Sequence, residues 1–123
     1  MKNQKFSIPA RLKSFSHALN GIKVLFREEH NAWVHLAGTI AVISLGVWTS
    51  ISSGEWVAIV FAIGFVWGME LINSAVERMA DHITTENNQL IKHSKDMAAA
   101  GVLLSAITAV VIAVIIFIPK IIN

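Results

Sequence analysis

Long stretches without any charged residue alternate with short charged segments along this chain. No Asp, Glu, Lys or Arg occurs within three of these stretches, residues 30–54, 56–69 and 97–119. A helix needs about 20 residues to cross a bilayer core roughly 30 Å thick. The first and third stretches are long enough, and the second becomes so because apolar residues continue past Glu70. The pattern predicts an all-α membrane protein with transmembrane helices near 32–50, 55–76 and 97–119.

The segment before these spans has a different pattern, with apolar and basic positions on opposite sides of a helix at about residues 9–29. Its apolar positions recur at helical spacing: Leu12, Phe15, Leu19, Ile22 and Phe26. Pro9 suits a first helical turn. A basic amphipathic helix beside membrane spans is expected to lie in the membrane interface. The alternative is a short cytosolic helix that packs on its own domain.

Small residues recur every four positions within two of the predicted spans. Gly64 and Gly68 form a G-x-x-x-G pair, and a second stripe consists of Gly101, Ser105, Ala109 and Ala113. Such stripes allow helix backbones to approach closely in lipid. Because three spans enclose little interior, we expect a packed and oligomeric helical bundle.

The amino-acid composition excludes several classes of protein and of functional site. The chain has 123 residues, of which 54% are hydrophobic and 15% charged, against about 25% charged in ordinary soluble domains. This length predicts one domain over 1–123. The absence of cysteine excludes disulfide scaffolds, thiolate metal sites and cysteine nucleophiles, and the absence of tyrosine excludes phenolic acid–base chemistry. A net charge of only +2 does not favour a nucleic-acid partner.

Basic residues are distributed unevenly around the predicted spans. Six precede the first span and three lie between the second and third: Lys2, Lys5, Arg11, Lys13, Lys23 and Arg27, then Arg78, Lys92 and Lys95. Only Lys120 follows the third span. The positive-inside rule therefore places the N-terminus and the 78–95 loop in the cytoplasm. We therefore expect the chain to be integral to a membrane, with these two segments on its cytoplasmic side.

The cytoplasmic end of the second span carries a concentration of polar residues. On a helix, Asn73, Glu77 and Asp81 fall at about −60°, −20° and +20° from Glu70, so that all four share one face. Glu70 lies about 10 Å deeper than Glu77. A carboxylate at that depth costs about 1–3 kcal/mol unless it is paired or hydrated, which favours a functional role. Asp81 alone is equally consistent with a structural ion pair.

Further charged residues are predicted at the same membrane level as Glu77: Glu28, Glu29, Lys95 and Asp96. Carboxylates on separate helices suit Mg²⁺ held through nucleotide phosphates, and a nearby lysine suits the phosphates themselves. The chain has no P-loop, no kinase-type glycine loop and no H-E-x-x-H motif. His35 is interpreted as a hydrogen-bonded packing residue rather than a metal ligand.

Four segments together resemble a known family. They are E-L-I-N-S-A-V-E-R-M-A-D at 70–81, N-G-I-K at 20–23, E-H-N-A-W-V-H-L at 29–36 and K-D-M-A-A at 95–99. They are similar to the small bacterial integral-membrane lipid kinases, the diacylglycerol kinase and undecaprenol kinase family, over about residues 10–120. The resemblance implies a homotrimer with active sites between subunits, a membrane lipid substrate, ATP as cosubstrate and Mg²⁺ as the metal.

The resemblance also implies roles for individual residues. Glu70 matches the catalytic carboxylate that takes or orients the proton of the lipid hydroxyl, and Ala99 lies at a substrate-binding position beside it. Glu29 and Glu77 match the metal ligands. Asn73 and Asp81 match supporting positions. The positions matched to ATP binding are His17, Glu29, Glu77, Glu86, Asn87, Asn88, Lys95 and Asp96.

The identity of the lipid and two non-enzymatic functions remain open at this stage. N-x-x-x-H at 31–35 and D-M-A-A-A-G at 96–101 resemble the undecaprenol branch more than the diacylglycerol branch. Intramembrane acids also mark ion pathways, although the outer part of the second span, 56–65, offers no polar residue to continue one. A regulatory membrane subunit with a structural acid cluster is the other alternative.

Overall fold

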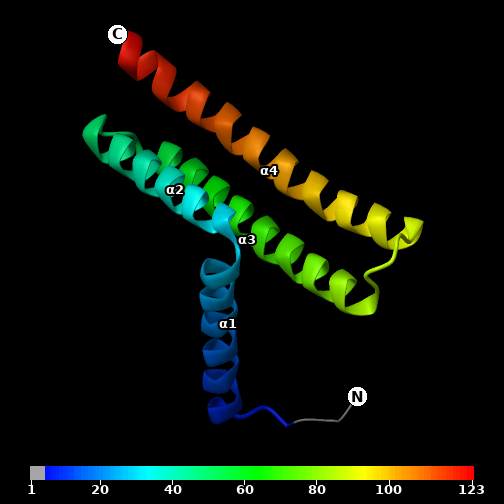
Figure 1. The fold of residues 1–123 in the computed structure, drawn as a ribbon. Helices are drawn as coiled ribbons and strands as arrows, with labels where there is room; N and C mark the ends of the chain where they lie inside the picture. Colours follow the sequence, from blue (N-terminus) through cyan, green and yellow to red (C-terminus); the bar gives the residue numbers. More distant parts are fainter. Residues whose placement is uncertain (1–4) are drawn as a thin grey trace.

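The computed structural model describes residues 5–123, and this part of the chain forms four helices (Figure 1). They are α1 (Ile8–Glu28), α2 (His30–Trp48), α3 (Ser53–Ile83) and α4 (Gln89–Ile122). α2, α3 and α4 run alongside one another, whereas α1 turns steeply away from them. α4 packs mainly against α3. The predicted all-helical architecture with three long apolar helices is confirmed.

α1 begins and ends at residues whose side chains or backbone suit a helix terminus. The Ser7 hydroxyl accepts a hydrogen bond from Ala10 N at 3.2 Å, and Pro9 lies in the first turn. Glu29 has extended dihedrals (φ −116°, ψ 116°) and is the only residue between α1 and α2. This break changes the chain direction. The helix predicted at 9–29 is therefore present, while its interfacial location stays a prediction; Lys2 lies outside the described residues.

A tight turn joins α2 to α3 at the end of the bundle away from α1 (Figure 1). The Ser52 hydroxyl accepts from Glu55 N at 3.2 Å, and the Glu55 carboxylate accepts from Ser52 N at 2.9 Å. This reciprocal capping box satisfies two backbone donors at the start of α3. A Cβ on Gly46 would lie 2.8 Å from the Trp56 ring. Glycine at this position therefore lets the ring pack against α2.

α3 and α4 extend well beyond the spans predicted at 55–76 and 97–119. The predicted 78–95 loop is wrong in extent, because residues up to Ile83 and from Gln89 onward are helical. Charged residues mark where a helix leaves the apolar part of a membrane. They do not end the helix itself, because backbone hydrogen bonding continues in water until a capping residue. Asn88 provides that cap for α4 by accepting from Leu90 N and Ile91 N. The extensions carry Glu77, Asp81, Lys95 and Asp96.

Little of the apolar surface is buried within one chain. The main buried apolar cluster contains Ile51, Ile59, Ile116 and Phe117, near the α2–α3 turn. Large side chains such as Phe61 and Ile115 are 74% and 67% exposed. Exposed apolar area on this scale marks a membrane or protein contact surface. With three helices long and apolar enough to cross a bilayer, the chain is a membrane protein.

Candidate functional site

Glu70 is the most deeply buried charged residue that the structure describes. Its exposed fraction is 2%, and it lies on the face of α3 that meets α2. Its Oε2 atom is 3.1 Å from Nε2 of His35. An ionised carboxylate only accepts hydrogen bonds, so Nε2 donates to it in that state. The prediction that Glu70 lies inside the protein at membrane depth is consistent with this burial.

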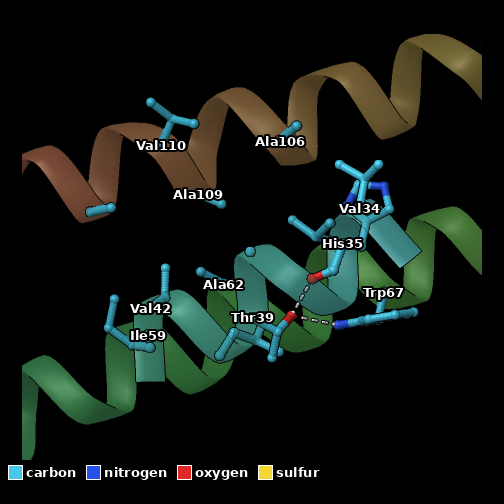
Figure 2. Close-up of a pocket in the computed structure, with 14 residues that line it drawn as sticks. Val34, His35, Thr39, Val42, Ile59, Ala62, Trp67, Ala106, Ala109 and Val110 are labelled. Atoms are coloured by element: carbon cyan, nitrogen blue, oxygen red, sulfur yellow. Dashed lines mark hydrogen bonds between the residues drawn. The ribbon is translucent and has the colours of Figure 1, made fainter. Parts of the chain in front are cut away.

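His35 itself is held by a chain of hydrogen bonds between α2 and α3. Figure 2 shows the Thr39 hydroxyl donating to the His35 carbonyl, at 2.7 Å, and accepting from the Trp67 indole, at 3.0 Å. The Trp67 ring stands edge-on to the His35 ring with centroids 6.0 Å apart. Each donor in this arrangement has an acceptor within hydrogen-bonding distance. The ring of His35 is therefore contacted by two side chains of α3, Glu70 and Trp67, and the Thr39 hydroxyl joins the His35 backbone to Trp67.

A cavity of about 300 Å³ lies beside these residues, between α2, α3 and α4 (Figure 2). His35, Thr39 and Trp67 form its polar edge. The rest of the wall is apolar and includes many small side chains: Val34, Gly38, Val42, Ile59, Ala62, Ile63, Val66, Ala106, Ala109, Val110 and Ala113. Two members of the predicted small-residue stripe, Ala109 and Ala113, line this cavity. The other two are closely packed, since Ser105 is fully buried and a Cβ on Gly101 would overlap the Met69 side chain.

Glu29 and Glu77 lie near Glu70 and form an acidic group with it at the junction of α1, α2 and α3. Burial and the neighbouring Glu77 and Glu70 carboxylates raise the pKa of Glu29 above its usual value of 4.5. The Asn73 amide donates to Glu77 Oε1 at 3.5 Å, while its own oxygen is buried without a partner in the described part of the chain. The like charges therefore oppose one another and would favour a cation between them.

The remaining charged residues of the extensions are already paired. Lys95 of α4 donates to Asp81 of α3 at 2.9 Å, and Lys92 donates to Asp96 at 2.7 Å. Arg78 of α3 pairs with Glu28 at the end of α1. All three pairs are exposed, and exposed pairs typically contribute about 0–1 kcal/mol. Two of them join different helices, Lys95–Asp81 and Arg78–Glu28, whereas Lys92–Asp96 lies within α4. Because such pairs are weak, a stronger anion could displace Asp81 from Lys95.

Several residues predicted for nucleotide or substrate contact are exposed on the surface of one chain. His17 is exposed on α1, Glu86 and Asn87 are exposed in the 84–88 connection, and Ala99 is exposed on α4. Asn88 serves as the N-cap of α4. Within residues 5–123, no three His, Asp or Glu side chains are close enough together to hold a metal ion. One chain therefore does not assemble the whole predicted site.

His35 is a hydrogen-bonded residue between two helices, as predicted, and the part that sequence reasoning missed is its partner, Glu70. Its contact with Glu70 depends on how α2 and α3 pair, since the two residues lie 35 positions apart. A local signal was nonetheless present. Thr39 follows His35 by one helical turn, and Trp67 precedes Glu70 by nearly one, so two polar pairs occur in antiparallel order on adjacent apolar spans.

Comparison with known proteins gives consistent matches along nearly the whole chain. The family model described as prokaryotic diacylglycerol kinase matches residues 16–117. The undecaprenol kinase of Bacillus subtilis (strain 168) is 36% identical over 119 residues, which cover 97% of each chain. The diacylglycerol kinase of Synechocystis is 28% identical over 99% of this chain and 70% of its own. The diacylglycerol kinase of Escherichia coli (strain K12) is 23% identical over 90% of this chain and 91% of its own length.

Proposed function

Because the chain belongs to the prokaryotic diacylglycerol kinase family and is a lipid kinase, we propose that it transfers the γ-phosphate of ATP to the primary hydroxyl of a membrane lipid alcohol. The acceptor would be undecaprenol or diacylglycerol, and the product would enter phospholipid or cell-envelope lipid-carrier metabolism. The observation that carries the proposal is the buried Glu70 carboxylate, which directly follows the uncharged stretch 56–69 of α3. A lipid hydroxyl lies at the depth where such a helix leaves the bilayer. Membership in a family of kinases sets aside the ion-pathway and regulatory alternatives.

Glu70 is proposed as the catalytic carboxylate. It takes the proton of the lipid hydroxyl while the hydroxyl oxygen bonds to the γ-phosphorus and the bond from that phosphorus to ADP breaks. The proton is later released to water, which restores the carboxylate. A base of this kind contributes about 10²–10⁴ to the rate when it lies within hydrogen-bonding reach of the proton. Burial limits the reach of water and keeps the carboxylate beside the lipid phase.

Glu29 and Glu77 are the residues proposed to hold Mg²⁺. Their oxygen donors suit this ion, which proteins commonly bind through one or two carboxylates together with substrate phosphates. Burial, followed by repulsion from Glu77 and Glu70, raises the pKa of Glu29. A cation between the carboxylates would relieve the repulsion, which supports the assignment. Mg²⁺ would supply neutralisation of phosphate charge there. The absence of a third protein ligand among residues 5–123 is compatible with ligands from the nucleotide.

Lys95 and Asp96 are proposed to contact the nucleotide, and Asn73 and Asp81 to support the site. The exposed Lys95–Asp81 pair supports this role, since phosphate could replace Asp81 at little cost. The other proposed nucleotide contacts are His17, Glu86, Asn87 and Asn88, with Ala99 proposed beside the lipid. All five are exposed in one chain. We therefore propose that a homotrimer completes each site with residues of a second subunit.

Undecaprenol is the acceptor that we propose over diacylglycerol. The undecaprenol kinase of Bacillus subtilis is 36% identical to this chain over 97% of both lengths, whereas the diacylglycerol kinases of Synechocystis and Escherichia coli are 28% and 23% identical. We also propose that the chain lies in the bacterial inner membrane, with the N-terminus and the connection at 84–88 in the cytoplasm. The excess of basic residues at that end supports this orientation.

Phosphate transfer from labelled ATP in mixed micelles tests the function. Undecaprenol and diacylglycerol are offered separately, each with Mg²⁺ and with EDTA. We expect Mg²⁺-dependent product, more of it from undecaprenol, and a loss of about 100-fold or more in Glu70→Gln. Glu55→Gln, at the opposite end of α3, is the matched control and should remain active. Full activity of Glu70→Gln in a folded protein would overturn the catalytic assignment, and no product from either lipid would overturn the proposed substrate class.

A further inference from the structure

The carboxylate of Glu70 depends on His35 for its hydrogen bonding. Among residues 5–123, the Nε2 atom of His35, 3.1 Å from Oε2, is its hydrogen-bond partner. The Glu70 side chain is almost completely shielded, with an exposed fraction of 3%. A buried carboxylate that loses its donor is strongly destabilised, because no water replaces the lost bond. Contacts that hold the His35 ring in place therefore also help to hold the Glu70 carboxylate in place.

The position of His35 is set from two sides. Thr39, one turn along α2, donates to the His35 carbonyl and accepts from the Trp67 indole. The Trp67 ring lies edge-on to the imidazole, and it also contacts Phe26 of α1, with ring centroids 5.4 Å apart. These contacts join three helices around one imidazole. Free rotation of the ring would have to disrupt packing on α3 or lose the bond to Glu70.

We propose that His35 is a positioning residue that orients Glu70 for phosphate transfer, an inference that rests on the proposed function. Donation from Nε2 occupies Oε2 and leaves Oε1 to accept the proton of the lipid hydroxyl. The reacting proton passes to Glu70, and His35 keeps its own. A misplacement of about 1 Å at a reacting group can cost about 10²-fold in rate. The contribution of His35 is therefore to the turnover rate rather than to substrate affinity.

The cavity beside His35 makes the contact difficult to replace. Val34, Gly38 and Val66 contribute apolar wall next to the imidazole. A shortened or apolar side chain at position 35 would leave Glu70 facing this wall without a donor. Glutamine differs, because its terminal amide is a donor at a similar distance from the backbone. His35→Leu removes the hydrogen-bond donor, whereas His35→Gln keeps a donor and changes only the shape of the side chain. Comparing the two separates these effects.

The test compares His35→Leu with His35→Gln in the full-length protein, in the mixed-micelle assay with the preferred lipid. We expect His35→Leu to lower kcat by about 10- to 100-fold, with KM values for ATP and lipid changed by less than about threefold. His35→Gln should recover kcat to within about fivefold of the unmodified protein. His82→Gln, which changes an exposed histidine at the end of α3, is the matched control and should leave both constants unchanged.

A double substitution shows whether His35 acts through Glu70. In the Glu70→Gln background, His35→Leu should cause no further loss, because the group that it positions is already removed. An additional loss of about tenfold or more would overturn the proposal by showing independent effects. Equal loss of kcat in folded His35→Leu and His35→Gln would overturn donation as the cause. If His35→Leu does not fold, His35→Asn replaces it, because its amide is too short to reach Glu70.

The two levels of the proposal fail in different ways. If the unmodified protein transfers no phosphate to either lipid, the proposed function fails, and the positioning role fails with it. If the unmodified protein is active, Glu70→Gln is inactive and His35→Leu retains full kcat, only the positioning role fails.

Discussion

Three acidic residues lie near one another at the proposed site. Glu29, Glu70 and Glu77 occupy the junction of three helices, and Asn73 and His35 provide the polar contacts that the structure describes for two of them. Like charges at short range disfavour the ionised forms. A metal and a nucleotide would offset that repulsion. The free protein is therefore expected to be less stable at this junction than a protein without the acidic group.

At the residue scale, Glu29 gives a pH-dependent prediction. Its folded-state pKa is raised above 4.5, so its contribution to stability is fully present below that pH and is lost as pH rises through the folded value. Glu29→Gln removes the ionisation. We expect its Tm advantage over the unmodified protein to grow, to a few degrees, between acidic and neutral pH.

Thermal unfolding in detergent checks this expectation. Glu86→Gln, which changes an exposed carboxylate in the 84–88 connection, serves as the control for the pH series without nucleotide. Adding Mg²⁺ with ATP should stabilise the unmodified protein more than Glu29→Gln. A Tm difference for Glu29→Gln that does not change with pH would contradict the assigned cause.

At the scale of elements, α3 joins the proposed site to the α2–α3 turn. One continuous helix runs from the capping box at Ser52 to Ile83, and it carries Glu70, Asn73 and Glu77 along one face. Its outer end is also tied to α4, because Glu55 pairs with Lys120 at 3.2 Å. Disturbing the cap should therefore loosen α3 at the end remote from the site while leaving the chemistry in place.

Ser52→Ala tests the contribution of the cap. Loss of an N-cap hydroxyl typically costs about 0.5–2 kcal/mol, so we expect a decrease of about 1 kcal/mol in the free energy of unfolding and nearly unchanged kcat. Ser53→Ala, one position further on, removes a hydroxyl for which the described residues provide no hydrogen bond, and should change stability by less than about 0.5 kcal/mol. Denaturant titration in mixed micelles measures both. Equal effects of the two substitutions would argue against the cap.

At the scale of the whole molecule, the exposed apolar surface and the charged helix ends decide how the chain sits in a membrane. Many large apolar side chains along the spans are exposed, which suits contact with lipid or with other copies. Charged residues gather at the end that contains Glu29 and the 84–88 connection. The same end contains the proposed site. The orientation of the chain in the membrane and its association with other copies therefore need separate measurements.

Orientation can be measured with introduced cysteines, because the chain has none of its own. We expect Thr85→Cys to react with a membrane-impermeant maleimide only after the cells are permeabilised, and Ser53→Cys to react in intact cells. Both positions are exposed. The reverse labelling pattern would contradict a cytoplasmic 84–88 connection.

Assembly can be tested at the G-x-x-x-G pair. A Cβ on Gly64 or Gly68 would meet nothing within 4 Å in one chain, so added bulk at these positions should disturb contacts between copies only. We expect Gly64→Leu to reduce the trimer fraction in cross-linking and light scattering, together with activity. Gly54→Leu, where a Cβ also meets nothing, is the control. An unaltered trimer in Gly64→Leu would exclude this face from the interface.

The sequence by itself determined the membrane class, the helical spans, the amphipathic first helix and the family. These follow from local periodicity, charge-free length and a contiguous motif, all of which act along the chain. It also brought Glu70, Asn73, Glu77 and Asp81 to one helix face, because that depends only on helical geometry. The individual catalytic, metal and nucleotide roles remain predictions.

Only the tertiary structure decided where the helices end in water, which charges pair and what contacts Glu70. The extents of α3 and α4 depend on caps at Thr84 and Asn88 rather than on hydropathy. The contact of His35 with Glu70 depends on the register between two antiparallel helices, and no local pattern specifies that register. Side chains distant in sequence meet only after packing has selected one alignment of their helices, and this is the physical reason that the contact had to be seen in the fold.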